Sequence, residues 1–349
     1  MEKSGQLSAP GSLEAGTAVV PEAPRLPAQP LGELAAEHGL KLSGARPSLP
    51  RYLVELWQRR HFIWGYATAR SVSMYTEARL GQLWQVLTPL LNAFVYYLIF
   101  GLLFQASRGV QNYPAFLVAG VFVFAFTERS IVTGSNVMRT NLQLIRALYF
   151  PRASLPLAYV LVELQQMMVG MVVLFAIMLI SGEPLTWYWL LLVPTVALQT
   201  MFNVGAALIV ARLGGSVADV GELIPFFLRI SRYFCGVMYM VTNLPAVVPE
   251  WGIKLLSLNP PAVYISLVRV ALMQSYRTNS PGNQPYNAAR CFAFHHPLPG
   301  HSPVPSLQAY CNAVVTNDDL WLAAVGWGVG FLVVGIIFFW QAESKYGRG

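Results

Sequence analysis

Residues 155–180 read LPLAYVLVELQQMMVGMVVLFAIMLI, a run with a single charged side chain, Glu163. A helix needs about 20 mostly apolar residues to cross a lipid bilayer, and this run is long enough. The whole chain has a matching composition, because 11% of its 349 residues are charged, 55% are hydrophobic and the mean hydropathy is +0.49. Soluble domains average about 25% charged residues. The composition therefore excludes a soluble enzyme and a nucleic-acid-binding protein, and it predicts an all-α integral membrane protein.

Five further apolar runs also predict membrane-crossing helices. The second run of the chain is apolar from Tyr113 to Phe126 and continues past Glu128, and the fifth is interrupted by Arg229 and Arg232. Tryptophans lie near several of the ends, where aromatic residues meet the membrane surface. We expect six transmembrane helices, at about residues 83–104, 113–126 with its continuation, 155–180, 187–211, 223–241 and 320–340.

Basic residues are concentrated in the connections on one side of the membrane, and Arg108, between the first two runs, is the exception among the short loops. Arg139, Arg146 and Arg152 separate the second and third runs, whereas the turn at 181–186 contains no Lys or Arg. Lys and Arg accumulate in cytoplasmic loops. We therefore expect a plasma-membrane protein that crosses several times, with both termini in the cytoplasm.

The segment before the first run predicts two features. Residues 1–50 are rich in Pro, Ala, Gly and Glu, which is typical of a disordered cytoplasmic arm. Residues 51–70 combine an apolar stripe with arginines, which predicts an amphipathic helix lying in contact with lipid headgroups. The residues of this interfacial helix that would contact lipid are Trp57, Arg59, Arg60 and Trp64.

The region between the fifth and sixth runs is too long for a simple turn. Its apolar stretches at 253–258 and 262–273 are each too short to cross the membrane. We expect two outer re-entrant helices broken at Asn259-Pro260-Pro261, followed by an exposed extracytoplasmic loop at 277–317. The membrane domain as a whole then extends over residues 71–349.

No motif for catalysis or cofactor binding is recognised. The sequence contains no GxxxxGK[ST] and no Gly-Lys pair, and so it has no P-loop for ATP phosphates. If the protein takes part in ATP-driven transport, ATP and Mg²⁺ would bind a separate chain. Three cysteines lack the spacing of a zinc site. Cys291 and Cys311 both fall in the loop placed outside, which predicts a disulfide between them, while Cys235 should stay reduced.

Charges within the second run need an explanation, because a charge at mid-membrane costs on the order of 3 kcal/mol. Glu128 and Arg129 are candidates for a polar translocation path, and aromatic residues could stack on sugars along it. The alternative is that the charges pair or reach the membrane surface and that the rings only pack against helices. The aromatic candidates are Phe122, Phe126, Tyr96 and Tyr97.

Two acidic residues at the start of the last run leave an enzymatic alternative open. Asp318 and Asp319 could serve a membrane glycosyltransferase as a base or as metal ligands. Acidic residues are also favoured at the N-terminus of any helix, and we prefer this second interpretation.

Three motifs resemble those of a known family. Residues 73–89 read SMYTEARLGQLWQVLTP, residues 141–156 read NLQLIRALYFPRASLP, and Asn259-Pro260 is followed by Arg269. They resemble the permease subunits of type-2 ABC exporters, in particular the Wzm- and TagG-like exporters of polysaccharides and polyol phosphates. The basic residues are 19 Arg and 4 Lys, which favours a GC-rich genome and, among the family's substrates, an actinobacterial galactan.

The resemblance implies a mechanism in which this chain is not itself an enzyme. Two copies would form a channel surrounded by membrane lipids, and two separate ATP-binding subunits would drive a lipid-linked polysaccharide through it. Other members of the superfamily export drugs or small lipids, which is the alternative within transport.

The second motif would supply the contact with the ATP-binding subunit. Asn141 is a plausible helix N-cap and Pro151 cannot continue a helix, which predicts a short coupling helix over 141–150. The residues expected at this contact are Asn141, Leu142, Ile145, Arg146, Tyr149, Phe150 and Arg152.

Overall fold

The computed structural model describes residues 48–74, 81–103, 112–148, 150–217, 219–241, 249–279 and 317–343. The chain divides into two units, Met1–Ala45 and Arg46–Gly349, and all the described residues belong to the second. Most of the predicted arm, Tyr149, the loop beyond residue 279 and the cysteine pair Cys291 and Cys311 lie outside the described residues.

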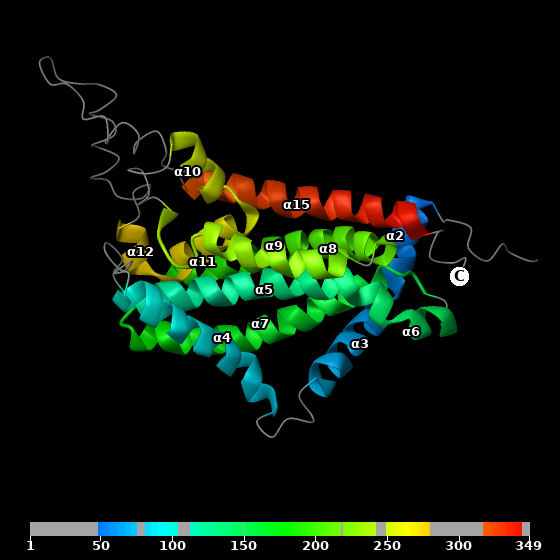
Figure 1. The fold of residues 1–349 in the computed structure, drawn as a ribbon, viewed down its shortest axis with the longest axis horizontal. Helices are drawn as coiled ribbons and strands as arrows, with labels where there is room; N and C mark the ends of the chain where they lie inside the picture. The colour runs from blue at the N-terminus through cyan, green and yellow to red at the C-terminus, as the bar shows by residue number, and fades with distance from the viewer. Residues whose placement is uncertain are drawn as a thin grey trace, which may run out of the picture. The chain divides into compact units, whose positions relative to one another are not determined.

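The described part of the chain is all-α, as predicted, and contains no strand (Figure 1). Five helical segments are long and apolar enough to cross a membrane. They match the first four predicted spans and the last one. They are α4 (Trp84–Tyr96) continued by the π-helix η2 (Tyr97–Leu103), α5 (Tyr113–Thr140), α7 (Ser154–Ile180), the 3₁₀ turn η3 (Trp187–Leu191) with α8 (Leu192–Ser216), and α15 (Asn317–Ala342).

The predicted fifth span differs from the structure. Helix α9 (Val220–Phe234) has only 15 residues, and Cys235 ends it. Gly236 follows with φ +64°, a left-handed conformation that commonly terminates helices and that glycine adopts without steric cost. The apolar run hides this break, because hydropathy does not distinguish helix from buried irregular chain. The count reaches six only if the next helix pair is taken as one span.

That helix pair lies in the segment predicted to contain two re-entrant helices. Helices α10 (Glu250–Ser257) and α11 (Pro260–Leu272) are bent by 72° relative to each other. The break lies at Leu258 and Asn259, where Pro260 and Pro261 open the second helix. Proline is favoured in a first helical turn and cannot continue a preceding helix, so the local sequence explains the bend. The short helix α12 (Gln274–Asn279) follows.

Helix α5 lies at the centre of the bundle, since most of its residues are buried, whereas most residues of the first span are not. It packs against α4, α7, α8, α9 and α11. Helices α8 and α15 make the most extensive pairing. Their backbones approach closely where Gly205 faces Phe331 and Gly335, and a Cβ on either glycine would clash with backbone atoms, an arrangement typical of membrane helix pairs.

The predicted interfacial helix is two helices rather than one. Helices α2 (Leu49–Gln58) and α3 (Arg60–Ser73) are separated at Arg59. Ile63 and Ala67 of α3 are buried against Ala158 and Val162 of α7. The exposed side of both helices carries basic as well as apolar residues.

The two ends of the bundle carry different elements (Figure 1). The short helix α6 (Leu142–Ala147) lies at the end where α5 and α15 finish. Helices α10 and α12 lie at the opposite end, together with the beginnings of α5 and α15. The short η1 turn (Gly81–Leu83) leads into α4.

Candidate translocation groove

A cavity of about 330 Å³ opens between α4, α5 and α9. One face of α5 forms its floor, because residues three, four, seven and eight positions apart lie on the same side of a helix. Three charged side chains reach this cavity from two different helices. The lining residues are Trp84, Thr88, Pro89 and Asn92 from α4, Val121, Phe124, Ala125, Glu128 and Arg129 from α5, and Arg232 from α9.

An ion pair connects two walls of the cavity. The Arg232 guanidinium donates to the Glu128 carboxylate, and both side chains are about one-fifth exposed. Arg232 also donates to the Tyr96 hydroxyl of α4 at 2.7 Å and lies over the Phe124 ring at 5.4 Å from its centroid. One guanidinium therefore joins α9 to both α4 and α5.

A second polar contact lies next to the first. The Arg129 guanidinium donates to the Gln166 side-chain oxygen of α7 at 2.9 Å and lies 3.8 Å from the carboxylate of Glu163. Glu163 is almost fully buried, whereas Arg129 is one-third exposed on the cavity side. The four charges sum to zero, which lowers the cost of placing them among apolar helices. The alternative considered from the sequence, that these charges pair with one another, is therefore correct. The same charges also have access to a cavity.

The aromatic candidates fall in different places. Tyr96 contacts Arg232 at the cavity, whereas Tyr97 packs against the Tyr113 ring with centroids 6.3 Å apart. Phe122 and Phe126 are buried in the core, 4% and 1% exposed. They lie on faces of α5 other than the cavity face, so they do not line the groove as it stands.

Sequence reasoning missed several groove residues. Arg232 is an intramembrane charge that was not included in the predicted path, and Thr88 and Asn92 were not predicted. Phe124 is one of the aromatic residues of the second run, but it was not chosen for the path. The helical period favours Phe124, because it precedes Glu128 by four residues. Nothing in the sequence shows that α9 turns Arg232 towards Glu128.

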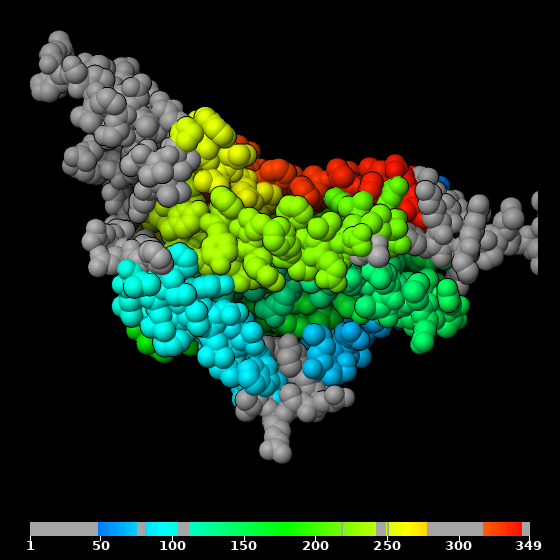
Figure 2. Space-filling model, viewed as in Figure 1, coloured from blue at the N-terminus to red at the C-terminus, as the bar shows by residue number. Residues whose placement is uncertain are grey.

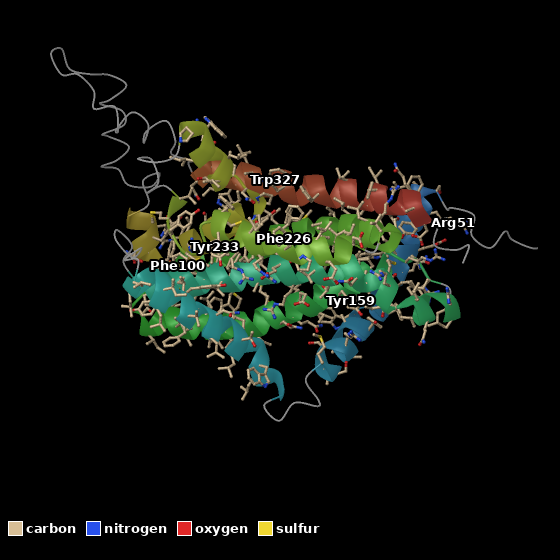
Figure 3. All side chains as sticks on the ribbon, viewed as in Figure 1. Arg51, Phe100, Tyr159, Phe226, Tyr233 and Trp327 are labelled. Atoms are coloured by element: carbon tan, nitrogen blue, oxygen red, sulfur yellow. The ribbon has the colours of Figure 1, made fainter. Side chains whose placement is uncertain are left out.

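The groove is flanked by two apolar and exposed helices, α4 and α9, both visible on the face in Figure 2. Phe226 and Tyr233 of α9, labelled in Figure 3, are 55% and 50% exposed. No residue of α9 except Gly221 is buried. Other exposed apolar residues of these elements are Leu91, Phe94 and Val95 of α4, Leu98 of η2, and Leu223, Phe227, Ile230 and Phe234 of α9.

The segment expected to contact an ATP-binding subunit is shorter than predicted. Helix α6 covers only Leu142–Ala147, because Leu148 is already extended. Leu142 is 48% exposed, Arg146 is exposed, and Ile145 is half-buried against a core cluster. Phe150 is buried, 5.6 Å from the Phe62 ring of α3.

The two polar ends of this segment point inward. Asn141 stands at the N-cap position, but its side chain makes no capping hydrogen bond. Its oxygen accepts from the Tyr66 hydroxyl at 3.0 Å, and its amide donates to the Tyr159 hydroxyl at 3.1 Å. Arg152 donates to the Glu343 backbone carbonyl at the end of α15. The outward surface is therefore formed by Leu142, Gln143, Arg146 and Ala147.

The N-terminal helices present aromatic and basic side chains outward. Trp57 and Trp64 are 70% and 57% exposed. Arg60 lies over the Trp57 ring, 5.5 Å from its centroid, and Arg59 is exposed.

Asp318 and Asp319 lie in the first turn of α15, and both are exposed. Among the described residues, no group of side chains could hold a metal ion.

Comparisons with known proteins agree with this architecture. The profile of the ABC-2 type transporter family matches residues 64–273. Two O-antigen export system permease proteins RfbA from Klebsiella pneumoniae are each 27% identical over 172 residues, which is 49% of this chain and 66% of the relative. The matched region thus covers slightly less than two thirds of these relatives. Since the family match extends over more than half of the chain and includes α4 to α11, this multi-pass membrane protein belongs to the ABC-2 type transporter family.

Proposed function

We propose that this chain is the permease subunit of an ATP-driven exporter that moves a lipid-linked polysaccharide out of the cell. The substrate class is inferred from the O-antigen export permeases to which the chain is similar. An O-antigen-like chain, a teichoic acid or a galactan each fits. The excess of Arg over Lys is typical of a GC-rich genome such as an actinobacterial one, and this favours the galactan.

The groove is the observation that carries this proposal. It places Glu128, Arg129 and Arg232 on a partly exposed surface between helices whose other exposed residues are apolar. A charged surface facing lipid is costly, so the face formed by α4 and α9 meets protein or polar substrate instead. The simplest partner is a second copy, because two such grooves facing each other enclose a polar path with aromatic walls.

The energy for transport comes from a different chain. The sequence contains no P-loop, so two ATP-binding subunits that bind ATP and Mg²⁺ work with the permease pair. Their contact is the exposed surface of α6 at the cytoplasmic end of the bundle. Helices α2 and α3 lie at the inner membrane surface, where Trp57, Trp64 and the neighbouring arginines contact headgroups.

Depletion of the chain in its own cell tests the proposal. Lipid-linked polysaccharide should accumulate on the cytoplasmic side, as measured by its resistance to a membrane-impermeant glycosidase, and it should return outside when the chain is restored. Normal export after depletion would contradict the proposal. Export of a drug or short lipid without any change in polysaccharide would instead support the small-molecule alternative.

A further inference from the structure

The chain leaves the helical conformation directly after α9. Residues Cys235 to Met240 are non-helical, and all of them except Tyr239 are buried. Their carbonyl groups therefore lack the N–H donors, four residues further along the chain, that a continuing helix would supply. Irregular backbone at membrane depth is tolerated only where protein satisfies its polar groups, so this turn needs donors from neighbouring elements.

Arg269 of α11 supplies most of these donors. Its guanidinium donates to the carbonyls of Gly236 and Val237, each at 2.8 Å. It also donates twice to the Phe116 carbonyl of α5, at 3.1 Å from Nε and 3.0 Å from Nη2. Arg269 is 2% exposed and lies 3.3 Å from the centroid of the Phe116 ring. A single side chain thus joins α5, the turn after α9, and α11.

The surrounding residues are shaped to fit this guanidinium. A Cβ at Gly120 of α5 would lie 2.5 Å from Arg269 Nη2 and 3.0 Å from the Val237 carbonyl oxygen. The hydroxyl of Tyr113 donates to the Met238 carbonyl at 2.7 Å, which adds a second tie between α5 and the same turn. Only glycine at position 120 leaves room for the guanidinium against the turn.

We propose that Arg269 is a positioning residue for the groove, acting through the turn that it holds. Gly236 follows Arg232 by four residues, about one helical turn, so fixing Gly236 on α5 fixes the place of Arg232 opposite Glu128 and Tyr96. Apart from its packing on α5 and the contacts of Arg232, α9 is little enclosed by the bundle, since none of its residues except Gly221 is buried. The consequence for export rests on the proposed function, whereas the positioning itself does not.

Arginine is required here because of its geometry. The planar fork presents five N–H donors at fixed angles, whereas the lysine ammonium is a point charge with three donors on a flexible stem. Arg269→Lys should therefore fail to hold the turn even though the charge is kept. Gly120→Ala provides an independent variant, because it displaces the guanidinium and leaves Arg269 itself unchanged. Gly330→Ala is the matched control, since a Cβ there meets no atom within 4 Å.

Hydrogen–deuterium exchange on the purified permease in nanodiscs measures the positioning directly. Both Arg269→Lys and Gly120→Ala should speed exchange in the peptide covering residues 233–241 by about tenfold or more, because local opening becomes easier. Amides of α7 and α8 should keep their wild-type rates, and Gly330→Ala should match the wild type throughout. In the complex with its ATP-binding subunits, both variants should lose export while ATP hydrolysis persists.

Exchange rates at residues 233–241 that equal those of the wild type in both variants would overturn the proposal. An equal rise of the exchange rates over the whole bundle would also overturn it, since that would indicate general destabilisation. The exchange measurement requires no substrate. If exchange rises as expected but the wild-type protein exports no polysaccharide, the proposed function fails and the positioning role of Arg269 stands.

Discussion

Glu183 is the most heavily hydrogen-bonded carboxylate in the described part of the chain. It lies in the turn between α7 and η3 and is 3% exposed. It accepts from the Asn112 amide at 2.7 Å, from the Gln274 backbone N–H at 2.8 Å, and from both the backbone and the hydroxyl of Ser275. One carboxylate therefore connects the start of α5, the α7–η3 turn and the start of α12.

This arrangement predicts a pH dependence of stability. Burial by itself raises the pKa of Glu183, but the hydrogen bonds from Ser275, Asn112 and Gln274 together lower it below its ordinary value of 4.5. A lowered pKa in the folded state gives stability that is complete above about 4.5 and is lost as the pH falls through the folded pKa. The melting temperature of the purified protein should therefore fall as the pH is lowered below 4.5.

Glu183→Gln should flatten that dependence. It should also lower the free energy of unfolding at pH 7 by about 1 kcal/mol, and with it the melting temperature. The cause is that a Gln NH₂ group faces donors where the carboxylate accepted. An unchanged pH profile in Glu183→Gln would show that Glu183 does not anchor these segments.

The Glu128–Arg232 pair carries a second residue-scale prediction. Replacing only one partner, by Glu128→Gln or Arg232→Gln, leaves a largely buried charge unpaired, which costs about 1–3 kcal/mol. Export should fall in each single variant. The swapped variant Glu128→Arg with Arg232→Glu restores opposite charges and should recover part of the export. Full export by both single variants, measured at equal expression, would show that the pair has no part in transport.

At the scale of elements, α6 is the most exposed helical segment at its end of the bundle. Its outward surface contains Leu142 and Arg146, whereas Ile145 contributes to the fold. Leu142→Asp and Arg146→Glu should leave the permease inserted and folded but reduce its association with the ATP-binding subunits, which co-purification measures. Val217→Asp is the control, because Val217 is 51% exposed after α8 and does not belong to α6. Co-purification that is equal in all three variants would remove α6 from the contact.

The elements show which parts of the fold the sequence could predict. The first four apolar runs and the last one predicted the correct helices, because a long apolar segment crosses lipid as an α-helix, which satisfies its own backbone hydrogen bonds. The Pro260-Pro261 pair likewise marked the bend before α11. The end of α9 could not be predicted, since its termination depends on Gly236 and on the distant Arg269.

The candidate site was predictable only in part. Glu128 and Arg129 were found because charges are rare in apolar runs, and the structure places both at the cavity. The expected capping role of Asn141 was wrong, because Tyr66 and Tyr159 compete for its side chain. Similarly, Arg152 is held by Glu343. These contacts join residues far apart in the sequence, so local patterns do not reveal them.

For the whole molecule, the orientation in the membrane is open to direct measurement. Leu185 lies in the turn between α7 and η3 and is 69% exposed, while Leu142 begins α6 and is 48% exposed. In a variant without native cysteines, an impermeant maleimide should label Leu185→Cys in intact cells. It should label Leu142→Cys only after the membrane is permeabilised. The opposite pattern would invert the topology and place α6 out of reach of any cytoplasmic ATPase.

The groove itself is tested most directly by photo-crosslinking during transport. A photoreactive amino acid is placed at Thr88 inside the groove and, as a control, at Val333, which is 49% exposed on α15 away from the groove. Each variant is reconstituted with the ATP-binding subunits and radiolabelled lipid-linked polysaccharide. We expect ATP-dependent adducts of the polysaccharide at Thr88 and none above background at Val333. Equal adducts at the two positions, or none at Thr88 while export proceeds, would contradict a path through the groove between α4, α5 and α9.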